Sequence, residues 1–349
     1  MKKNGIAVVG RVAERTELLD GQTVKTKILY EELRKTFPDR KIICIDTYQY
    51  RKNALPILYR TLKAFMECEH FFVLLSRNGR KFFFPVLTWL NALFHRKLYH
   101  DVVGGALPEE ARMRPALRKQ LKRFVVNWVE FPEMKTQLEN LGINNVEVLP
   151  NFKRLQLLSE DELGCVQTSP FLFTMFSRVI KQKGIETAAE SIAEVNRRFG
   201  GQKAVLHIYG PVEESYQREF SELLVKFNDC VFYKGCVPYD ESVKALRNSF
   251  MLLFPSVYKG EGMPGTIIDA FSAGVPVIAS DWHFNGELVR NDETGYCYDW
   301  KNPKLLTERI CYAIDHPEKI DRMRKGCLKE AKKYTPEAAM EQICRKILK

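Results

Sequence analysis

Two carboxylates stand in an apolar stretch of this sequence, where a charge without a role would be costly. Glu261 lies in the Gly- and Pro-rich segment KGEGMPG, and Asp269 follows eight residues later among Ile267, Ile268 and Phe271. Burying an unpaired charge costs free energy. Each acid alone has an ordinary explanation, Glu261 as a solvated loop residue and Asp269 as a partner for the positive end of a helix. Their occurrence together favours a binding or catalytic role.

A pair of cations follows an earlier apolar run. In the segment FTMFSRVIKQKG, Arg178 comes shortly after the apolar residues, and Lys183 follows five residues later, just before Gly184. A guanidinium donates bidentate hydrogen bonds and an ammonium acts as a point charge, so the two can neutralise a diphosphate without a metal ion. Taken singly, such residues are usually solvated surface charges. Their position at the end of an apolar run favours a ligand.

Both sets of residues follow runs that predict buried strands of a parallel sheet. Short apolar runs alternate with longer amphipathic stretches along almost the whole chain, which is the pattern of βα units. Ligands bind such sheets at the carboxyl ends of the strands, where loops lead into helices. The predicted strands are 5–10, 41–46, 71–75, 97–103, 124–128 and 146–150 in the first half, and 171–177, 204–210, 231–235, 250–254 and 276–280 in the second.

A helix is expected directly after the loop that carries Glu261. It should begin near Gly265 and Thr266, with Gly274 as the glycine that follows its end. The free amides of a first helical turn attract anions. Asp269 would lie about one turn inside this helix. Both acids are therefore expected to face the same cleft.

The length and the two series of strands indicate two domains. A chain of 349 residues exceeds what one hydrophobic core usually organises. The stretch NFKRLQLLSEDELGCVQTSP separates the two series and is polar, without a sustained period. This stretch places the predicted boundary near residue 165.

The positive charge is concentrated in the first half of the chain. Residues 1–150 contain 26 Lys and Arg against 16 Asp and Glu, a net of +10, whereas the remaining residues contain 28 against 27, a net of +1. An anionic partner is therefore expected to meet the first half. Nucleic acid is not expected, because no helix-turn-helix, zinc or RNA-binding signature accompanies the charge.

Residues 77–97 combine cations with an aromatic segment that Pro85 is expected to break. One interpretation is a helix whose Phe and Leu side chains are buried in the core. The other is an interfacial segment whose aromatic and basic residues meet an anionic bilayer. The composition of the segment alone favours the core helix, whereas the net positive charge of the first half of the chain supports the membrane interpretation.

Cysteine spacing and hydropathy predict a cytoplasmic protein, and the net charge of the first half favours a peripheral position at the inner face of the plasma membrane. The nine cysteines include no CxxC pair, so reduced thiols without a metal or redox role are expected. The apolar run before Arg11 is too short for a signal peptide. No run approaches the roughly 18 apolar residues of a membrane span.

The second half of the chain resembles glycosyltransferase family 4, retaining enzymes of the GT-B fold. The resemblance is strong over about residues 170 to 300, in the segments FSRVIKQKG, LHIYGP, VFYKGCVP, LLFPSVYKGEGMPGTIIDAFSAGVPVIASDW and ELVRNDETGYCYD. It implies an α/β protein with two Rossmann-like, doubly wound domains that face a cleft. The acceptor-side domain would be 1–165 and the donor-binding domain 166–334, with a C-terminal helix at about 335–349 crossing back to the first domain.

The resemblance also implies a role for each matching residue. Arg178 and Lys183 match the basic pair that stabilises the departing diphosphate, and Glu261 matches the acid near the hydroxyls of the donor sugar. These three are the expected catalytic residues, and Asp269 matches the acid on the ribose hydroxyls. No cofactor or metal ion is expected. The remaining donor-binding positions are Gly21, Gln22, Val237, Gly262, Met263, Pro264, Gly265 and Thr266.

The chain departs from the family pattern at two positions. Asp269 is one methylene shorter than the usual Glu, so its contact with the ribose is expected to shift or to use a water molecule. The family often has a His at the end of the strand that here leads to Gly104 and Gly105. His100 lies inside that strand and is expected to be a packed residue rather than a catalytic one.

These observations predict a glycosyltransferase that moves a sugar from a nucleotide diphosphate, expected to be a UDP-sugar, to a glycan or lipid-linked oligosaccharide in bacterial surface polysaccharide synthesis. A nucleotide-sugar 2-epimerase of similar architecture and a non-catalytic nucleotide-sugar-binding subunit are the alternatives. A dinucleotide oxidoreductase is disfavoured because the first predicted strand leads into VVGRVAER, which lacks the G-x-G-x-x-G pattern.

Overall fold

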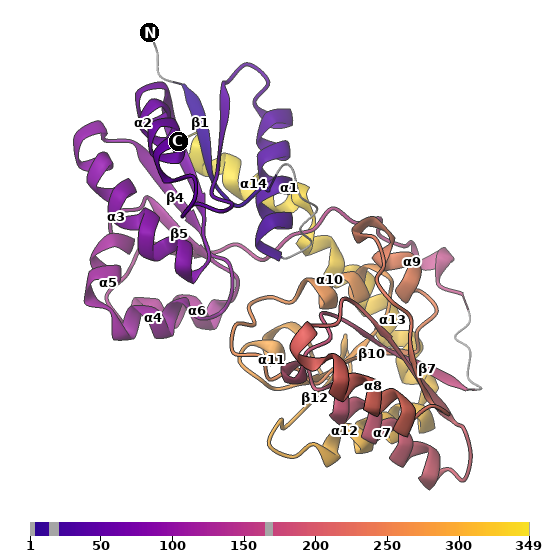
Figure 1. The fold of residues 1–349 in the computed structure, drawn as a ribbon. Coiled ribbons are helices and arrows are strands. Elements are labelled where there is room, and N and C mark those ends of the chain that lie inside the picture. The colour runs from indigo at the N-terminus through magenta and orange to yellow at the C-terminus, as the bar shows by residue number, and fades with distance from the viewer. Residues whose placement is uncertain (1–3, 14–20, 165–169, 349) are drawn as a thin grey trace. The chain divides into compact units, whose positions relative to one another are not determined.

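The chain forms two compact units, each with its own parallel sheet (Figure 1). The computed structural model describes residues 4–13, 21–164 and 170–348. Unit 1 comprises Met1–Lys153 and Thr335–Lys349, and unit 2 comprises Arg154–Tyr334.

The chain passes from unit 1 to unit 2 earlier than the position near residue 165 that the sequence indicated. The segment from Arg154 onward packs on unit 2. The Leu158 amide donates to the Ser272 carbonyl (3.0 Å), and the Arg324 guanidinium donates to the Gly164 carbonyl (2.7 Å). Residues 154–164 are therefore not a free linker despite their polar composition, because the backbone groups of Leu158 and Gly164 bond to the second unit.

Unit 1 is a six-stranded parallel sheet in the order β2-β1-β3-β4-β5-β6. Its strands are β1 (Gly5–Gly10), β2 (Ile42–Asp46), β3 (Cys68–Leu74), β4 (Lys97–Asp101), β5 (Val126–Val129) and β6 (Val146–Val148). Its helices are α1 (Gly21–Thr36), α2 (Ala54–Glu67), α3 (Arg77–Phe94), α4 (Leu107–Met113), α5 (Pro115–Leu121), α6 (Pro132–Glu139) and α14 (Pro336–Ile347).

The C-terminal helix α14 is part of unit 1 although 181 residues of unit 2, Arg154–Tyr334, precede it in the chain. It packs against α1 (Figure 1). Gln342 donates from Nε2 to the carbonyl of Val148 at 2.8 Å, and Lys346 forms an ion pair with Glu147. Both contacts attach α14 to β6, the strand at the edge of the sheet.

Unit 2 is a second six-stranded parallel sheet, in the order β12-β11-β10-β7-β8-β9. Its strands are β7 (Phe171–Phe176), β8 (Ala204–Tyr209), β9 (Val231–Tyr233), β10 (Met251–Phe254), β11 (Val277–Ser280) and β12 (Gly295–Tyr298). Its helices are α7 (Ile185–Arg198), α8 (Gln217–Lys226), α9 (Ser242–Leu246), α10 (Gly265–Ser272), α11 (Asn285–Leu288), α12 (Lys304–Asp315) and α13 (Pro317–Ala331).

Helices cover the sheet of unit 2 in packed pairs. Helix α7 packs against α12, and α10 packs against α9 and α13 (Figure 1). The strands between them are apolar on both faces, as a parallel sheet covered by helices requires. Phe173, Leu206 and Leu253 are fully or almost fully buried in this core.

Every predicted strand is present, with ends that differ by up to three residues. Strand β12 (GYCY) was not predicted from the sequence. It was also wrong that Pro85 breaks its segment, since α3 continues through this proline. Pro85 leaves the carbonyl of Lys81 without its helical donor, and both residues are exposed, so water can replace the missing bond.

Among the described residues, none of the helices has the length and apolar character needed to cross a membrane.

Candidate active site

The predicted cations and the predicted acids lie on two loops that leave neighbouring strands of unit 2. Strand β7 pairs with β10 at the centre of the sheet, although the two are the first and the fourth strand of the unit along the chain. The chain order reverses between them, and ligands bind doubly wound sheets at such a switch point, beyond the carboxyl ends of the strands. Arg178 and Lys183 follow β7, whereas Glu261 follows β10.

The loop after β7 turns back on the loop after β10. Lys183 ends the 3₁₀ turn η2 (Lys181–Lys183), and Gly184 follows with a φ of 73°. A Cβ at Gly184 would lie 2.5 Å from the carbonyl oxygen of Pro255, so only glycine fits this approach of the two loops. The Val257 amide donates to the Gln182 carbonyl at 2.9 Å and joins the loops directly.

Lys183 and Glu261 form a buried ion pair. The Nζ of Lys183 lies 2.6 Å from Oε2 of Glu261, and the Oγ of Ser256 donates to the same oxygen at 2.8 Å. All three residues are buried. In a buried site such bonds hold a side chain more tightly than at the surface, because water competes less for its charge. The structure therefore brings two of the three predicted catalytic residues into direct contact.

Arg178 and Lys183 both lie over the ring of Tyr258. The guanidinium carbon of Arg178 lies 5.6 Å from the centroid of Tyr258, and the Nζ of Lys183 lies 5.4 Å from that centroid. The Lys183 Nζ also lies 5.2 Å from the ring of Phe254. Arg178 is exposed whereas Lys183 is buried. The site thus holds one solvent-facing cation and one inner cation, both stabilised by the faces of aromatic rings.

Helix α10 has the predicted bounds at both ends. It begins at Gly265. At its end, the Gly274 amide donates to the Phe271 carbonyl (3.0 Å) and the Val275 amide donates to the Ala270 carbonyl (2.8 Å), which is the Schellman pattern of a helix that ends in a left-handed glycine. At the first turn, the Thr266 hydroxyl donates to the carbonyl of Phe176, the last residue of β7. The N-terminus of α10 is therefore attached to the carboxyl end of β7.

Asp269 is buried inside the unit. Only 2% of it is exposed, and its Oδ1 accepts a hydrogen bond from the Oγ of Ser242 at 3.1 Å. Ser242 begins α9, just after the 3₁₀ turn η4 (Tyr239–Glu241), and the pKa of the Tyr239 hydroxyl is raised by burial and by the nearby Asp269 charge. Val237 lies half-buried just before this turn. Asp269 thus connects α10 to the segment in which the sequence placed the nucleobase.

The two donor-binding positions predicted in the first half lie in unit 1. Gly21 is the first residue of α1, and Gln22 donates from Nε2 to the carbonyl of Leu74, the last residue of β3 (3.0 Å). One turn further on, the buried Lys25 donates to Asp101 at 2.6 Å, at the end of β4. Burial raises the pKa of the Asp101 carboxyl, while Lys25 opposes that shift. The side chain of Gln22 therefore holds the start of α1 on its sheet.

His100 is a packed residue of β4, as the sequence predicted. It is fully buried and stands edge-on to Phe84, with ring centroids 4.9 Å apart. Asn127 uses its amide nitrogen on the carbonyls of Leu121 and Asn145. Its Oδ1, 3.0 Å from His100 Nδ1, therefore accepts, and the Nδ1 atom carries the proton. Burial lowers the pKa of His100 to about 3, so the ring is neutral at ordinary pH.

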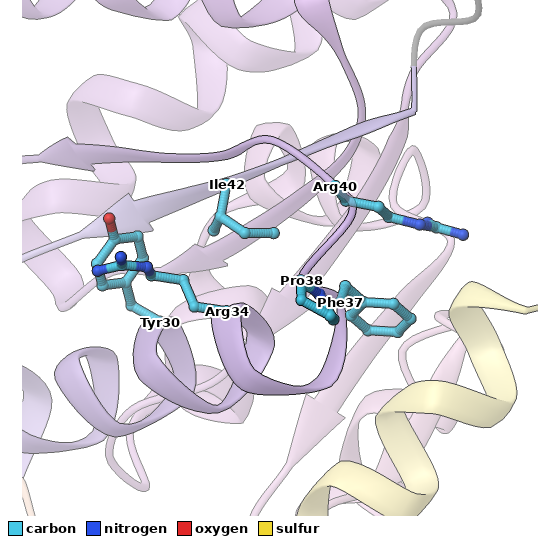
Figure 2. A pocket seen from close by; sticks show the side chains of 6 residues that line it. All are labelled: Tyr30, Arg34, Phe37, Pro38, Arg40 and Ile42. Carbon is cyan, nitrogen blue, oxygen red and sulfur yellow. The ribbon is translucent and has the colours of Figure 1, made fainter.

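A hollow lies beside the last turns of α1 in unit 1. Tyr30 and Arg34 on the last turns of α1, with Phe37, Pro38, Arg40 and Ile42 of the following segment, line it (Figure 2). Arg34 lies over the ring of Tyr30 and Arg40 over the ring of Phe37. None of the predicted donor-binding residues lines this hollow.

Three residues of the site were not singled out in the sequence. Ser256 positions Glu261, Tyr258 carries both cations on its ring, and Ser242 holds Asp269. Ser256 and Tyr258 stand in the loop between β10 and α10, so their place after a buried strand was a usable signal. Ser242 lies 27 residues from Asp269, and no local pattern in the sequence indicates that contact.

Residues 166–330 match the family described as glycosyl transferases group 1. An uncharacterized glycosyltransferase of Methanocaldococcus jannaschii is 20% identical over 233 residues, which are 65% of this chain and 56% of that protein. The putative colanic acid biosynthesis glycosyltransferase WcaL of Escherichia coli is 23% identical over 148 residues, covering 41% of this chain and 36% of WcaL. The alignments thus span about half of the curated relatives' own length, or less.

The crystal structure of Anabaena HepE in complex with UDP matches this chain with a TM-score of 0.75 at 14% identity, and the match covers 98% of this chain and 99% of that one. This likeness shows the fold, the two-domain α/β architecture called GT-B, as the sequence predicted. The matched family and the named relatives identify residues 166–330 as a domain of glycosyltransferases.

Proposed function

We propose that this chain transfers a sugar from a nucleotide diphosphate donor, a UDP-sugar, to a glycan or lipid-linked oligosaccharide during synthesis of a bacterial surface polysaccharide. The observation that carries the proposal is the cluster at the switch point of unit 2, where Arg178, Lys183 and Glu261 meet at the carboxyl ends of β7 and β10. HepE was crystallised with UDP, and WcaL is named for colanic acid biosynthesis. The first name supports a UDP-sugar as the donor, and the second supports a surface polysaccharide as the product.

In the proposed reaction, the bond between the anomeric carbon and the β-phosphate oxygen breaks, and the nucleoside diphosphate leaves with the bonding electrons. Arg178, Lys183 and the first-turn amides of α10 stabilise the charge that develops on this leaving group. The acceptor hydroxyl then bonds to the oxocarbenium-like carbon on the same face, and its proton passes to a phosphate oxygen. The product keeps the anomeric configuration of the donor. The two cations supply the positive charge of this step, so the proposal includes no metal ion or cofactor.

The two acids have separate positions in this proposal. Both hydrogen bonds to Glu261 go to Oε2, so we assign Oε1 to a hydroxyl of the donor sugar. Asp269 lies on α10 and binds Ser242, so we assign it to the ribose end of the donor, near Val237. This arrangement differs from a retaining glycosidase, whose two carboxyls face each other across the scissile bond.

Donor binding is the first test of the proposal. A ligand that binds the folded protein raises its apparent stability, so UDP should raise the melting temperature of the full chain more than GDP or ADP does. Lys183→Ala should lose this shift. If none of the three diphosphates changes the melting temperature of the wild-type protein, the proposed donor site is wrong.

Transfer is the second test. The protein should move sugar from its UDP-sugar to a lipid-linked acceptor, and the product should have the donor's anomeric configuration in its proton coupling constants. Conversion of the nucleotide sugar into its C2 epimer without an acceptor would instead identify an epimerase. Donor binding with neither hydrolysis nor transfer, across nucleotide sugars and acceptors, would identify a non-catalytic binding subunit.

A further inference from the structure

Helix α2 is apolar on two faces, and only one of them is covered. Ile57, Thr61, Ala64 and Phe65 are buried against the rest of unit 1. A second stripe is exposed to solvent, with Leu55 79% and Tyr59 68% accessible. Its members are Leu55, Leu58, Tyr59, Leu62 and Met66. At 3.6 residues per turn these positions lie within about 100° of one another around the helix.

Helix α3 has the same arrangement. Its buried side carries Phe83, Phe84, Leu87 and Leu90. Its exposed side carries an apolar stripe at a spacing of three or four residues, in which Trp89 is 65% accessible. The stripe consists of Phe82, Pro85, Trp89 and Leu93.

The two stripes lie on helices that cover the same face of the sheet. The chain enters α2 from β2 and leaves into β3, then enters α3 and leaves into β4, so both crossovers run in the same direction across the order β2-β1-β3-β4. Right-handed crossovers of the same direction place their helices on one face. The two helices touch, with ring centroids of Phe65 and Phe94 5.6 Å apart, whereas α1 and α14 pack together elsewhere on unit 1 (Figure 1).

The surroundings of the two stripes are cationic. The sequence contains no Asp or Glu from Thr47 to Met66 or from His70 to His100. The two acids between these segments face lysines, since Glu67 lies 2.6 Å from Lys41 and Glu69 lies 3.3 Å from Lys97. The exposed Lys and Arg residues on or beside the two helices are Arg51, Lys52, Arg60, Lys63, Arg77 and Lys81.

We propose that the exposed faces of α2 and α3 dock unit 1 on an anionic lipid bilayer. Amphipathic helices that lie in the plane of a membrane bury apolar side chains at the headgroup boundary, while basic residues beside them attract anionic lipids. Tyr59 and Trp89 are of the two residue types that favour this interface. A second copy of the chain fits the surface less well, because pairing the two faces would bring like charges together. The sequence analysis considered membrane binding only for residues 77–97. The exposed stripe on α2 adds a second apolar face beside that segment.

Vesicle binding of the full chain tests this proposal without depending on sugar transfer. The protein should sediment with vesicles of phosphatidylcholine mixed with phosphatidylglycerol, and weakly or not at all with phosphatidylcholine alone. High salt should reduce the bound fraction, because it screens exposed charges. Vesicles should also shift the tryptophan emission to the blue, since Trp89 would enter the apolar layer.

Matched variants distinguish binding through this surface from non-specific binding to vesicles. The triple variant Leu55→Gln, Tyr59→Gln and Trp89→Gln should lose at least ten-fold in vesicle affinity and keep its circular dichroism and its UDP response. Val225→Gln is the control, because Val225 on α8 of unit 2 is 74% exposed, much like Leu55. It should bind vesicles as the wild type does.

Three results would overturn the proposal. The wild type fails to bind anionic vesicles, or it binds neutral and anionic vesicles equally, or the triple variant and Val225→Gln bind equally well. A wild-type dimer in sedimentation velocity that the triple variant dissociates, without vesicle binding, would assign the surface to a second copy of the chain.

Discussion

The ammonium nitrogen of Lys183 lies 2.6 Å from a carboxylate oxygen of Glu261, across 78 residues of sequence. Both side chains are about nine-tenths buried, so neither charge has bulk water as its main partner. Removing one member of such a pair leaves an uncompensated buried charge. In the proposed reaction the pair also has to loosen, because Lys183 must share its hydrogen bonds with the phosphates of the donor.

Lys183→Ala and Glu261→Ala should each abolish sugar transfer while the chain remains folded. Each should also lower the free energy of unfolding by about 3 kcal/mol, because each leaves the other charge buried without its partner. The double variant Lys183→Met with Glu261→Gln should lose less than the sum of the two single losses, since no charge is stranded. Urea unfolding and a transfer assay measure the two effects.

Lys181→Ala is the matched control for this prediction. Lys181 stands in the same 3₁₀ turn and pairs with Glu219 at 2.8 Å, but both members of that pair are exposed to solvent. Exposed pairs contribute little, so this variant should keep wild-type stability and most of its transfer activity. Near-wild-type turnover of Lys183→Ala or Glu261→Ala would show that the site assignment is wrong.

Asp269→Asn should weaken the affinity for donor more than it slows the chemical step. Asp269 is buried and holds Ser242 at the start of α9, so it acts on the donor through the position of that segment as well as by contact. Asp269→Asn removes the charge and keeps an acceptor oxygen for Ser242, whereas Ser242→Ala removes the hydrogen bond and leaves the acid in place. The latter variant should raise the KM for donor in the same direction and leave kcat nearly unchanged.

Ser272→Ala on the same helix provides the comparison, because the buried Ser272 hydroxyl donates within α10, to the carbonyl of Ile268. It should leave the KM for donor unchanged. An unchanged KM in Asp269→Asn would count against a ribose role for this residue.

Gly184→Ala should damage unit 2 more than Gly200→Ala does. Both glycines have a positive φ, 73° and 70°, which alone costs an alanine about 1 kcal/mol. A Cβ at Gly184 would also lie 2.5 Å from the carbonyl oxygen of Pro255, whereas a Cβ at Gly200 would have no atom of the described residues within 4 Å, apart from its chain neighbours. Only Gly184→Ala should push the two loops apart and weaken donor binding. Equal losses of stability in urea for the two variants would contradict this account.

Acid should destabilise unit 1 through His100. Burial holds the pKa of His100 at about 3, below its ordinary value of 6.5, so the folded state keeps this ring neutral while the unfolded chain takes up a proton. The stabilisation is complete above pH 6.5 and falls by about 1.4 kcal/mol per pH unit as the pH drops below that value, until the folded ring also binds a proton. His100→Asn keeps a donor for Asn127. It should make the free energy of unfolding depend less on pH below 6.5.

Urea unfolding at pH 7, 6 and 5 measures the slope that His100 contributes. His70, whose pKa burial lowers to about 4, adds a similar contribution that His100→Asn leaves in place. The exposed His95 provides the matched variant, His95→Asn. If His95→Asn reduces the slope as much as His100→Asn does, burial of His100 is not the cause.

The sequence predicted the parts of this structure that depend on local patterns. The apolar runs around Leu253 and Ile278 are buried on both faces of a parallel sheet, which is why they read as strands without alternation. The spacing from Gly265 to Gly274 predicted both ends of α10 because the Gly- and Pro-rich loop before the helix and the left-handed glycine after it are local signals. Lys183 and Glu261 were predicted to share a site because each follows a strand.

The rest depends on contacts between residues far apart in the chain. That Glu261 binds Lys183 directly, and that Asp269 binds Ser242, follows from the pairing of β7 with β10 and from the packing of α9 on α10. The exposed stripe of α2 was missed for another reason. The sequence alone does not show whether an apolar residue of a helix faces the core or solvent. Ile57 and Leu58 are neighbours in α2, yet Ile57 is buried and Leu58 is exposed.

The position of α14 determines the order in which the newly made protein can be completed. Unit 2 is continuous in sequence, so all of its strands have been synthesised before Thr335 is added. The sheet of unit 1 is synthesised before unit 2, yet the helix that packs on α1 and binds the edge strand at Val148 is synthesised after unit 2. A chain that stalls before Thr335 would contain all of unit 2 but would lack α14. The surface of unit 1 that α14 covers beside α1 would then be exposed to chaperones and proteases.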